Sequence, residues 1–220
     1  MEIVNDHRTA TLRLPASDRR LQLVETALDF FSRKGFSGTT TKEIAAAAGV
    51  TEAIIFRHFP TKQDLYNAVL GHHHESGQLA ECIAQWKSCM DRNDDEGLIR
   101  AIIEKVLEGF RNDLRVNRVL MFAALEGHEA ALEYNRQFSL PILDLLWQYV
   151  ARRQNEGALR GSDPGAIIAA AYGMAAQYAT MTQLYGFRTT TTDSQMVDSF
   201  VAIVMHGIVP DQHTQRGINQ

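Results

Sequence analysis

Three polar residues in the N-terminal third of the chain have the spacing of helix-capping residues. Thr40 can cap the start of a helix, and Glu43, three positions later, can reach back to the backbone N–H of Thr40. Gly49 supplies the backbone freedom that ends this helix, and Thr51 can cap a second short helix that runs to about His58. Two helices joined by a short turn around a glycine form a helix-turn-helix. The second helix of such a unit can enter the major groove of DNA and present its N-terminal side chains to base edges.

The order of residue types in this stretch resembles the DNA-binding region of the TetR family of bacterial transcriptional regulators. The resemblance rests on Thr-Thr-x-x-Ile-Ala-x-x-Ala-Gly-Val-Thr, followed by Ile-Phe-x-His-Phe-Pro-x-Lys. It covers about Leu21 to Tyr66, roughly a fifth of the chain. Members of the family often have tyrosine at the position of Phe56 and glycine at that of Ala53, so this chain lacks a phenol that would contact phosphate.

The resemblance also implies which residues contact DNA. Lys42 can donate to guanine O6 and N7, Glu52 can accept from cytosine N4, and the side chain of Ala53 or Ile54 can contact a thymine methyl group. The positions that lie against phosphate are matched by Thr40, Thr41, Phe56, His58 and Lys62. The alternative is that the two capping threonines, Thr51 included, only cap their helices, and that Glu52 only stabilises its helix N-terminus.

The two short helices need a third helix against which to bury their apolar sides. Apolar residues recur at spacings of three and four from about Asp18 to Lys34, which predicts one helix that ends at Gly35. This stripe comprises Leu21, Val24, Ala27, Leu28 and Phe31. We therefore expect a three-helix DNA-binding domain over 18–62. Residues 1–17 are expected to form a mobile arm. The arginines in and next to the arm either touch DNA or belong to a solvated tail; they are Arg8, Arg13, Arg19 and Arg20.

Helical periodicity continues to the C-terminal end, and strand-like alternation is missing, so the sequence predicts an all-α fold of about nine helices. A helix that begins at Thr61 and runs to about residue 80 or beyond is a natural lever between the DNA-binding unit and the next domain. Later helix boundaries are predicted at Asn93-Asp94, Gly127-His128, Pro141, Asp163-Pro164, Asp193 and Pro210. We expect a C-terminal helical bundle over 63–210 for ligand binding and dimerisation, and a tail over 211–220.

Composition and charge are compatible with this organisation. The chain has 220 residues, 45% of them hydrophobic, and a net charge of -4. Residues 1–62 carry a charge of +2 and residues 63–220 a charge of -6, so only the first part leans basic, as a local DNA-binding patch requires. No apolar segment is long enough to span a membrane or to act as a signal peptide, so we expect a cytoplasmic protein without a membrane partner.

Residue patterns that would indicate catalysis or a metal site are missing from the sequence. We find no glycine-rich phosphate loop, nucleophile elbow or HExxH motif, so we expect neither an enzyme nor a cofactor. His72, His73 and His74 are consecutive and would point about 100 degrees apart on a helix, so they cannot share one metal ion. Cys82 and Cys89 would lie on one helix face, and we interpret them as buried thiols rather than as a redox pair.

The resemblance implies a ligand pocket inside the C-terminal helices, for a small apolar or aromatic effector. The candidate lining residues are Trp86, Phe110, Met121, Phe122, His128, Trp147, Gln177, Tyr178 and Met181, with Met90, Glu126, Tyr172 and Met174 as further members. The alternative is that the aromatic and methionine side chains are ordinary core residues. Effector binding would have to favour the state whose two DNA-binding units have the wrong spacing.

The resemblance also implies a homodimer formed by the last two helices. The first of these helices is rich in alanine, which allows a neighbouring helix to approach closely. The candidate interface residues are Tyr172, Ala175, Ala176, Ala179, Phe200, Val201 and Val204, and the alternative is that both helices are core elements. A two-fold pair would bind a palindromic DNA operator. The sequence thus favours a ligand-released repressor, with a helix-turn-helix protein controlled by a protein partner as the alternative.

Overall fold

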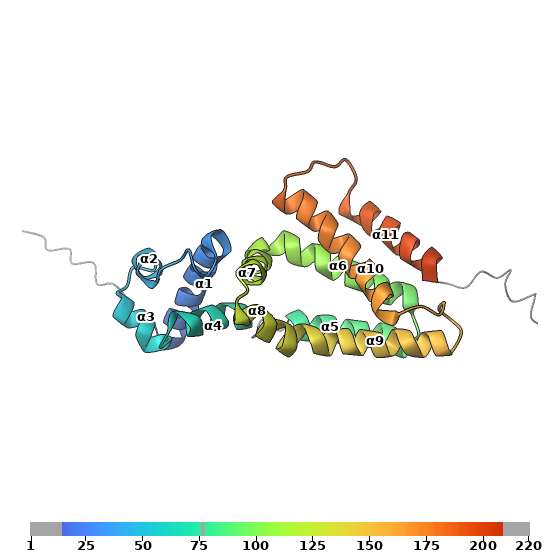
Figure 1. Ribbon diagram of the computed structural model, residues 1–220. Coiled ribbons are helices and arrows are strands. Elements are labelled where there is room, and N and C mark those ends of the chain that lie inside the picture. The colour runs from blue at the N-terminus through green and yellow to red at the C-terminus, as the bar shows by residue number, and fades with distance from the viewer. Residues whose placement is uncertain (1–14, 76–77, 209–220) are drawn as a thin grey trace, which may run out of the picture.

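The computed structural model describes residues 15–75 and 78–208, and Figure 1 shows this part of the chain as an assembly of helices. Within these ranges the fold is all-α, with helices α1 to α11, two short π-helical segments and no strand. Arg8, Arg13, Pro210 and the predicted tail over 211–220 lie outside the described residues.

The N-terminal unit contains the three predicted helices and the one that follows them. These are α1 (Ala16–Lys34), α2 (Thr41–Ala47), α3 (Glu52–His58) and α4 (Lys62–Glu75). Their shared core is built on side chains that are less than 5% exposed: Leu23, Val24, Ala27, Leu28, Phe31, Ile44, Ala45, Ile55, Phe59, Leu65 and Tyr66. Leu21 was predicted to belong to this core, but it is 47% exposed, and Leu23 takes its place on the buried face.

The C-terminal bundle contains five longer helices around a second core. They are α5 (Gln78–Asp91), α6 (Asp95–Asn112), α9 (Leu140–Asn155), α10 (Pro164–Ala179) and α11 (Asp193–Ile208). Helix α6 is central, because it packs against α5, α10 and α11. A largely buried ion pair at 2.8 Å, from Arg153 Nη2 to Asp95 Oδ2, joins α9 to α6.

Two helices join the N-terminal unit to the bundle. They are α7 (Leu114–Leu125) and α8 (Glu129–Tyr134), which Figure 1 shows between the two parts. The buried side chains of α7, Val116, Val119 and Ala123, belong to the core of the N-terminal unit, and α7 packs along α1. The N-terminal core is therefore larger than a three-helix domain, because α4, α7 and α8 complete it.

The described residues form more α-helical elements than the nine we predicted. The predicted lever helix is described as α4 up to Glu75, and α5 is described from Gln78; residues 76–77 between them lie outside the described residues. The helix predicted to contain Pro141 runs from α8 through a π-helical segment at Asn135–Ser139 into α9, which has Pro141 in its first turn. Ser139 and Leu140 keep right-handed helical backbone angles, so the chain does not restart a helix at Pro141, which was one of the two predicted outcomes.

The cap of the last helix differs from the prediction. We expected Asp193 to cap it, but Asp193 is the first helical residue of α11. Thr192 caps instead: its Oγ1 accepts from Gln195 N at 3.3 Å, and its N–H donates to Gln195 Oε1 at 3.0 Å. Thr192 rather than Asp193 caps the helix because Gln195, at the third helical position, completes a capping box with Thr192.

Candidate nucleic-acid interface

The start of α2 has the predicted capping box. The N–H of Glu43 donates to Thr40 Oγ1 at 3.2 Å, and the N–H of Thr40 donates to Glu43 Oε2 at 2.9 Å. Lys34 Nζ donates to the other carboxylate oxygen of Glu43 at 2.6 Å. These hydrogen bonds, with that from Lys34 first, lower the pKa of Glu43 from 4.5 to about 2. The loop between α1 and α2 is thus stabilised by the ion pair of Lys34 with Glu43 and by the capping box of Thr40 and Glu43.

The start of α3 is built differently from the prediction. Thr51 has the extended backbone of a capping residue, but its side chain makes no capping hydrogen bond, so this part of the prediction is wrong. The turn from α2 into α3 is set instead by two features. Gly49 has a φ of 68°, and the N–H of Val50 donates to Ala45 O at 2.9 Å. Ile55 anchors α3 in the core with no exposed surface.

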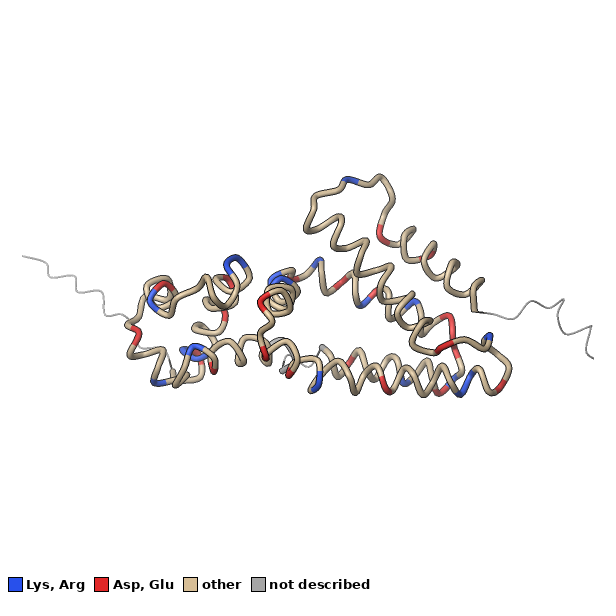
Figure 2. The backbone as a smooth tube through the Cα atoms, in the orientation of Figure 1, with Lys and Arg blue, Asp and Glu red and all other residues tan. Residues whose placement is uncertain are grey.

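The outer face of α2 and α3 presents the predicted base-reading side chains. Lys42 and Ala53 are exposed, whereas Glu52 and Ile54 are partly buried. Phe56 is 44% exposed, a large apolar side chain next to the charged Arg57. Figure 2 shows Lys and Arg distributed over α1, α2 and α3, with acidic residues between them.

Arg57 is a candidate that we did not predict. It lies in the last turn of α3 and is exposed, which suits a phosphate contact. In the sequence, this contact is indicated only by the presence of a basic residue in the second helix of the helix-turn-helix. Arg20, on α1, lies with its guanidinium 4.8 Å from the ring centroid of Phe59, just beyond the end of α3.

Two predicted phosphate-contacting residues are partly withdrawn into the protein. His58 Nε2 is buried and has no hydrogen-bond partner among the described residues. Burial lowers the pKa of His58, and Arg57, Arg20 and Arg19 lower it further. Lys62 Nζ donates to Phe36 O at 2.5 Å and lies 4.2 Å from the centroid of the Phe36 ring, and burial lowers its pKa. Both residues belong to the N-terminal unit, but Lys62 Nζ already donates to a backbone oxygen within it, that of Phe36.

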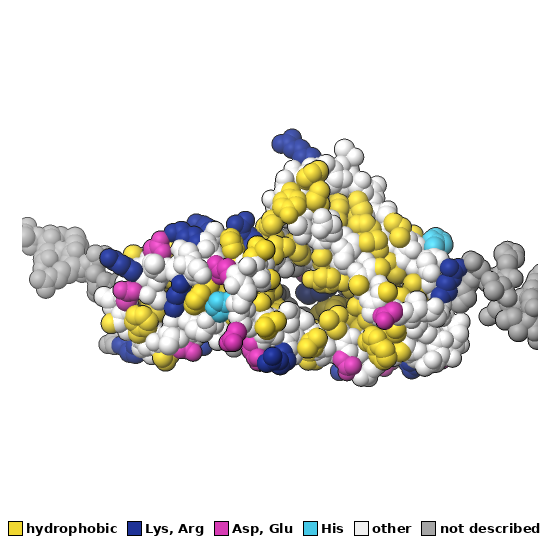
Figure 3. All heavy atoms as spheres, in the orientation of Figure 1, with side chains coloured by type: hydrophobic (Ala, Val, Ile, Leu, Met, Phe, Trp, Pro, Cys, Tyr) yellow, Lys and Arg dark blue, Asp and Glu magenta, His cyan; other side chains and the backbone are white. Residues whose placement is uncertain are grey.

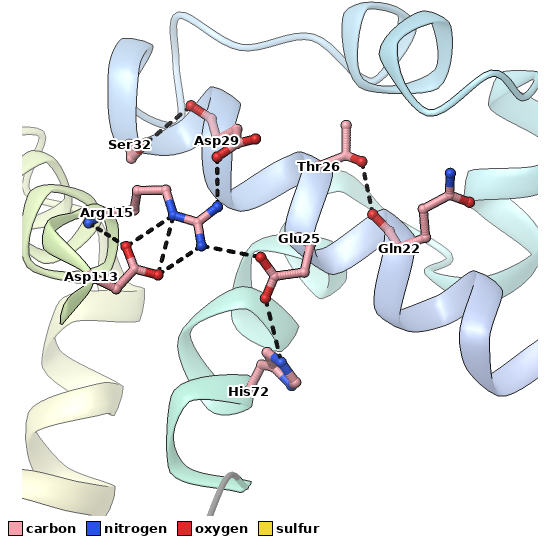
Figure 4. A network of polar contacts seen from close by, with 8 residues as sticks. All are labelled: Gln22, Glu25, Thr26, Asp29, Ser32, His72, Asp113 and Arg115. Atoms are coloured by element: carbon pink, nitrogen blue, oxygen red, sulfur yellow. Dashed lines mark hydrogen bonds and ion pairs between the residues drawn. The ribbon is translucent and has the colours of Figure 1, made fainter.

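A charged network joins this unit to α7, and Figure 4 shows it at close range. Arg115 Nη1 donates to Asp29 Oδ1 on α1 at 2.6 Å, and its Nη2 donates to Glu25 Oε2 at 3.2 Å and to Asp113 Oδ2 at 2.7 Å. Glu25 Oε1 also lies 3.6 Å from His72 Nε2 on α4. The hydrogen bond with Asp113, and then that with Asp29, raises the pKa of Arg115, so the network keeps this guanidinium charged.

A second joint lies at the other end of α7. Glu126 accepts from the N–H groups of Phe36 at 3.1 Å and Ser37 at 3.3 Å, in the loop that leads into α2. The Phe36 ring packs edge-on against Tyr66, with centroids 5.1 Å apart, and Tyr66 OH donates to Val119 O on α7 at 3.3 Å. Helix α7 is thus joined to α1 at its N-terminal end, and its middle and C-terminal end are joined to α4 and to the loop after α1.

The structure does not bring the predicted pocket residues together. Trp86 and Phe110 are buried in the core of the bundle, whereas Trp147 and Gln177 are at the surface. Met121 and Tyr178 pack against that core and are partly buried, as are Phe122, Met174 and Met181. His128 and Glu126 belong to the joint with the DNA-binding unit; the His128 ring lies 4.4 Å from that of Phe36, and its Nδ1 accepts from Ala130 N at 3.1 Å.

Several predicted interface residues pack inside one chain. Ala175, Ala179, Val201 and Val204 are at most 4% exposed within the bundle core, so they offer no surface to a partner. This corrects the prediction for these four residues, because the alanine-rich helix uses one face for its own core. Tyr172 is 54% exposed, and Ala176 and Phe200 are partly buried.

The arrangement of α2, Gly49 and α3 defines a helix-turn-helix DNA-binding protein. Residues 23–69 match the family profile described as "Bacterial regulatory proteins, tetR family". The fold is similar to that of solved TetR-family regulators, and the match to the family profile covers the helix-turn-helix and parts of its flanking helices. None of the described helices is long and apolar enough to cross a membrane, and no group of three metal-binding side chains occurs among the described residues.

Three similar proteins illustrate the match. The transcriptional activator FasR of Mycolicibacterium smegmatis is 31% identical over 108 residues, 49% of this chain and 48% of FasR, so this chain spans about half of that relative. The transcriptional repressor Rv3405c of Mycobacterium tuberculosis is 29% identical over 174 residues, 74% of this chain and 78% of the repressor. The solved structure of AibR with isovaleryl coenzyme A and operator DNA is 22% identical, with a TM-score of 0.61; the match covers 84% of this chain and 97% of AibR.

Proposed function

We propose that this protein is a transcriptional regulator that binds a specific DNA operator through α2 and α3. The observation that carries the proposal is the division of α3 into two faces: Ile55 is fully buried, whereas Ala53, Phe56 and Arg57 are exposed. A helix held from behind in this way can enter the major groove without losing its packing. Exposed Lys42, at the start of α2, adds a donor for base edges or phosphate.

The regulator acts as a homodimer on a palindromic site. One short recognition helix contacts only a few base pairs, so two copies related by a two-fold axis are needed for tight binding. Support comes from the outer face of α10, where Ala166, Ala169, Ala170 and Gly173 follow at helical spacing. A Cβ added at Gly173 would meet no other atom within 4 Å, so this face is open to a neighbouring helix. On the neighbouring helix α11, Ile203 is a second exposed apolar residue, at 60% exposure.

A small apolar effector releases the operator. Figure 3 shows a hollow in the surface of the helical bundle with hydrophobic side chains around it. The Trp86 Nε1–H group in the bundle core is buried and has no hydrogen-bond partner among the described residues. A buried donor without an acceptor destabilises a protein by about 1 to 3 kcal/mol, so an apolar effector that brings one acceptor oxygen would be favoured at this position.

The DNA part of the proposal is tested by selection from a pool of random duplexes, followed by a salt titration of the enriched sequence. We expect a palindrome whose half-sites lie about one helical turn apart or more. Each phosphate contact should add about one to the slope of the logarithm of affinity against the logarithm of salt concentration. If no sequence is enriched, and binding is lost at moderate salt, the protein is not an operator-binding regulator.

A further inference from the structure

The first residues of the two helix-turn-helix helices are hydrogen-bonded to each other. Thr41 Oγ1 donates to Glu52 Oε1 at 2.6 Å, and both side chains are partly buried. Thr41 begins α2 and Glu52 begins α3, so this bond ties together the two helix ends that face DNA in a helix-turn-helix. Hydrogen bonds to a carboxylate are shorter and stronger than bonds between neutral groups, so the bond selects one orientation of Glu52.

The bond changes what each of the two side chains can do. A threonine hydroxyl has a single proton to donate, and that of Thr41 is given to Glu52. It is therefore not available to a phosphate oxygen, which is the contact that the sequence predicted for Thr41. The bond uses Oε1 of Glu52, and no hydrogen bond to the second oxygen, Oε2, occurs among the described residues.

An ionised carboxylate only accepts hydrogen bonds, and this determines which base it can face. Cytosine presents only a donor, its N4 amino group, on the major-groove edge. Guanine and thymine present acceptors there, and adenine places its N7 acceptor beside its N6 donor. The phosphates around the groove repel a free glutamate, so a carboxylate remains at the base edge only if another group holds it.

We propose that Thr41 is a positioning residue for base recognition, which holds Glu52 so that its free oxygen reads a cytosine in each half-site. The inference rests on the proposed function, because it requires that α3 enters the major groove. It replaces the phosphate contact predicted for Thr41 with a role in specificity.

The test compares the sequences that four proteins select from random duplexes: the wild type, Thr41→Val, Thr41→Ser and Glu52→Gln. Valine has the shape of threonine without the hydroxyl, and serine keeps the hydroxyl. We expect one cytosine position per half-site at which the wild type discriminates by about tenfold. Thr41→Val should lose most of this preference at that position alone, Thr41→Ser should keep it, and Glu52→Gln should shift it toward adenine, which pairs with an amide.

A double variant and a fold control make the result decisive. At the same position, Thr41→Val should change nothing further once Glu52 is replaced by alanine, which has no oxygen to accept the Thr41 hydroxyl, because the two residues act through one contact. The melting temperature of each variant shows whether it is folded. An unchanged motif for folded Thr41→Val overturns the inference, as does an equal loss of affinity for all sequences, which would indicate a phosphate contact. If the wild type itself selects no motif, the proposed function fails and the inference fails with it.

Discussion

Arg115 Nη1 lies 2.6 Å from Asp29 Oδ1, so the first turn of α7 is tied to the middle of α1 by an ion pair. Both side chains are partly exposed, but Glu25 and Asp113 also bind the same guanidinium, which gives a network rather than an isolated pair. Glu126, directly after α7, accepts from two N–H groups of the loop after α1, so both ends of α7 are joined to the DNA-binding unit. A displacement of α7 relative to the bundle would therefore displace α1 and the helices that it supports.

Replacing Arg115 should loosen this joint. Arg115→Gln leaves Asp29, Glu25 and Asp113 as three neighbouring carboxylates without their common partner, and we expect a loss of about 1 to 3 kcal/mol in the free energy of unfolding. Urea denaturation measures this loss. The matched control is Arg136→Gln, whose side chain is 71% exposed and, among the described residues, pairs with Glu133 alone; it should change stability by less than about 0.5 kcal/mol. Equal effects for the two variants would show that the network contributes nothing special.

Glu43 makes the stability of the N-terminal unit depend on pH in acid. Its pKa is about 2 in the folded protein against 4.5 ordinarily, so its contribution is complete above about pH 4.5 and is lost as the pH falls toward 2. Between these values the unfolded chain takes up a proton that the folded chain does not. Glu43→Gln removes this titration, so its melting temperature should fall less steeply than that of the wild type over the same interval.

The partner variant Lys34→Met should show the same flattening, since the hydrogen bond from Lys34 is the largest cause of the lowered pKa of Glu43. Melting temperatures measured by circular dichroism at several pH values from 4.5 to 2 provide the comparison. Parallel profiles for the wild type and both variants would contradict the role assigned to this pair.

The open face of α10 predicts where a dimer can be broken. Ala170→Arg puts a long charged side chain on this face, and we expect the protein to sediment as a monomer and to lose most of its operator affinity, because a single half-site binds weakly. Ala84→Arg is the control, since Ala84 is exposed on α5, away from this face. Sedimentation equilibrium measures the molar mass of both variants. If the Ala170→Arg protein is still a dimer, the interface lies on another face.

Much of the fold is local enough to be predicted from the sequence. The capping box of Thr40 and Glu43 and the proline at the start of α10 depend on residues within a few positions of each other, and both are confirmed. The errors are also local in origin. Thr192 and Asp193 are adjacent capping candidates, and only Gln195, three positions after Thr192, decides between them.

The site was less predictable because its key contacts join distant residues. Arg115 binds Asp29 and Glu25, which lie 86 and 90 positions earlier, so no spacing in the sequence indicates the pairing. For a similar reason, the sequence does not indicate which face of α10 packs into the core of its own chain. Alanines occur around most of that helix, and only the positions of α6 and α11 determine that Ala175 and Ala179 are the buried ones.

Lys42 and Lys62 should differ in how they affect DNA binding. Lys42→Ala removes an exposed donor at the start of α2 and should reduce operator affinity by about 1 to 3 kcal/mol, with little effect on random DNA. Lys62→Ala should weaken binding to all sequences and reduce the salt slope by about one, because the Nζ that donates to Phe36 O has two further protons for a phosphate. Fluorescence anisotropy with both duplexes at several salt concentrations separates the two effects. Equal losses on operator and random DNA for Lys42→Ala would remove this residue from the base readers.

The most direct test of the central claim is a competition between the selected duplex and a scrambled duplex of the same composition, at about 0.15 M salt, where specific and nonspecific binding separate. If α2 and α3 read bases, the wild type should prefer the selected duplex by at least about a thousandfold. A ratio close to one would contradict the account, because binding would then come from phosphate contacts alone.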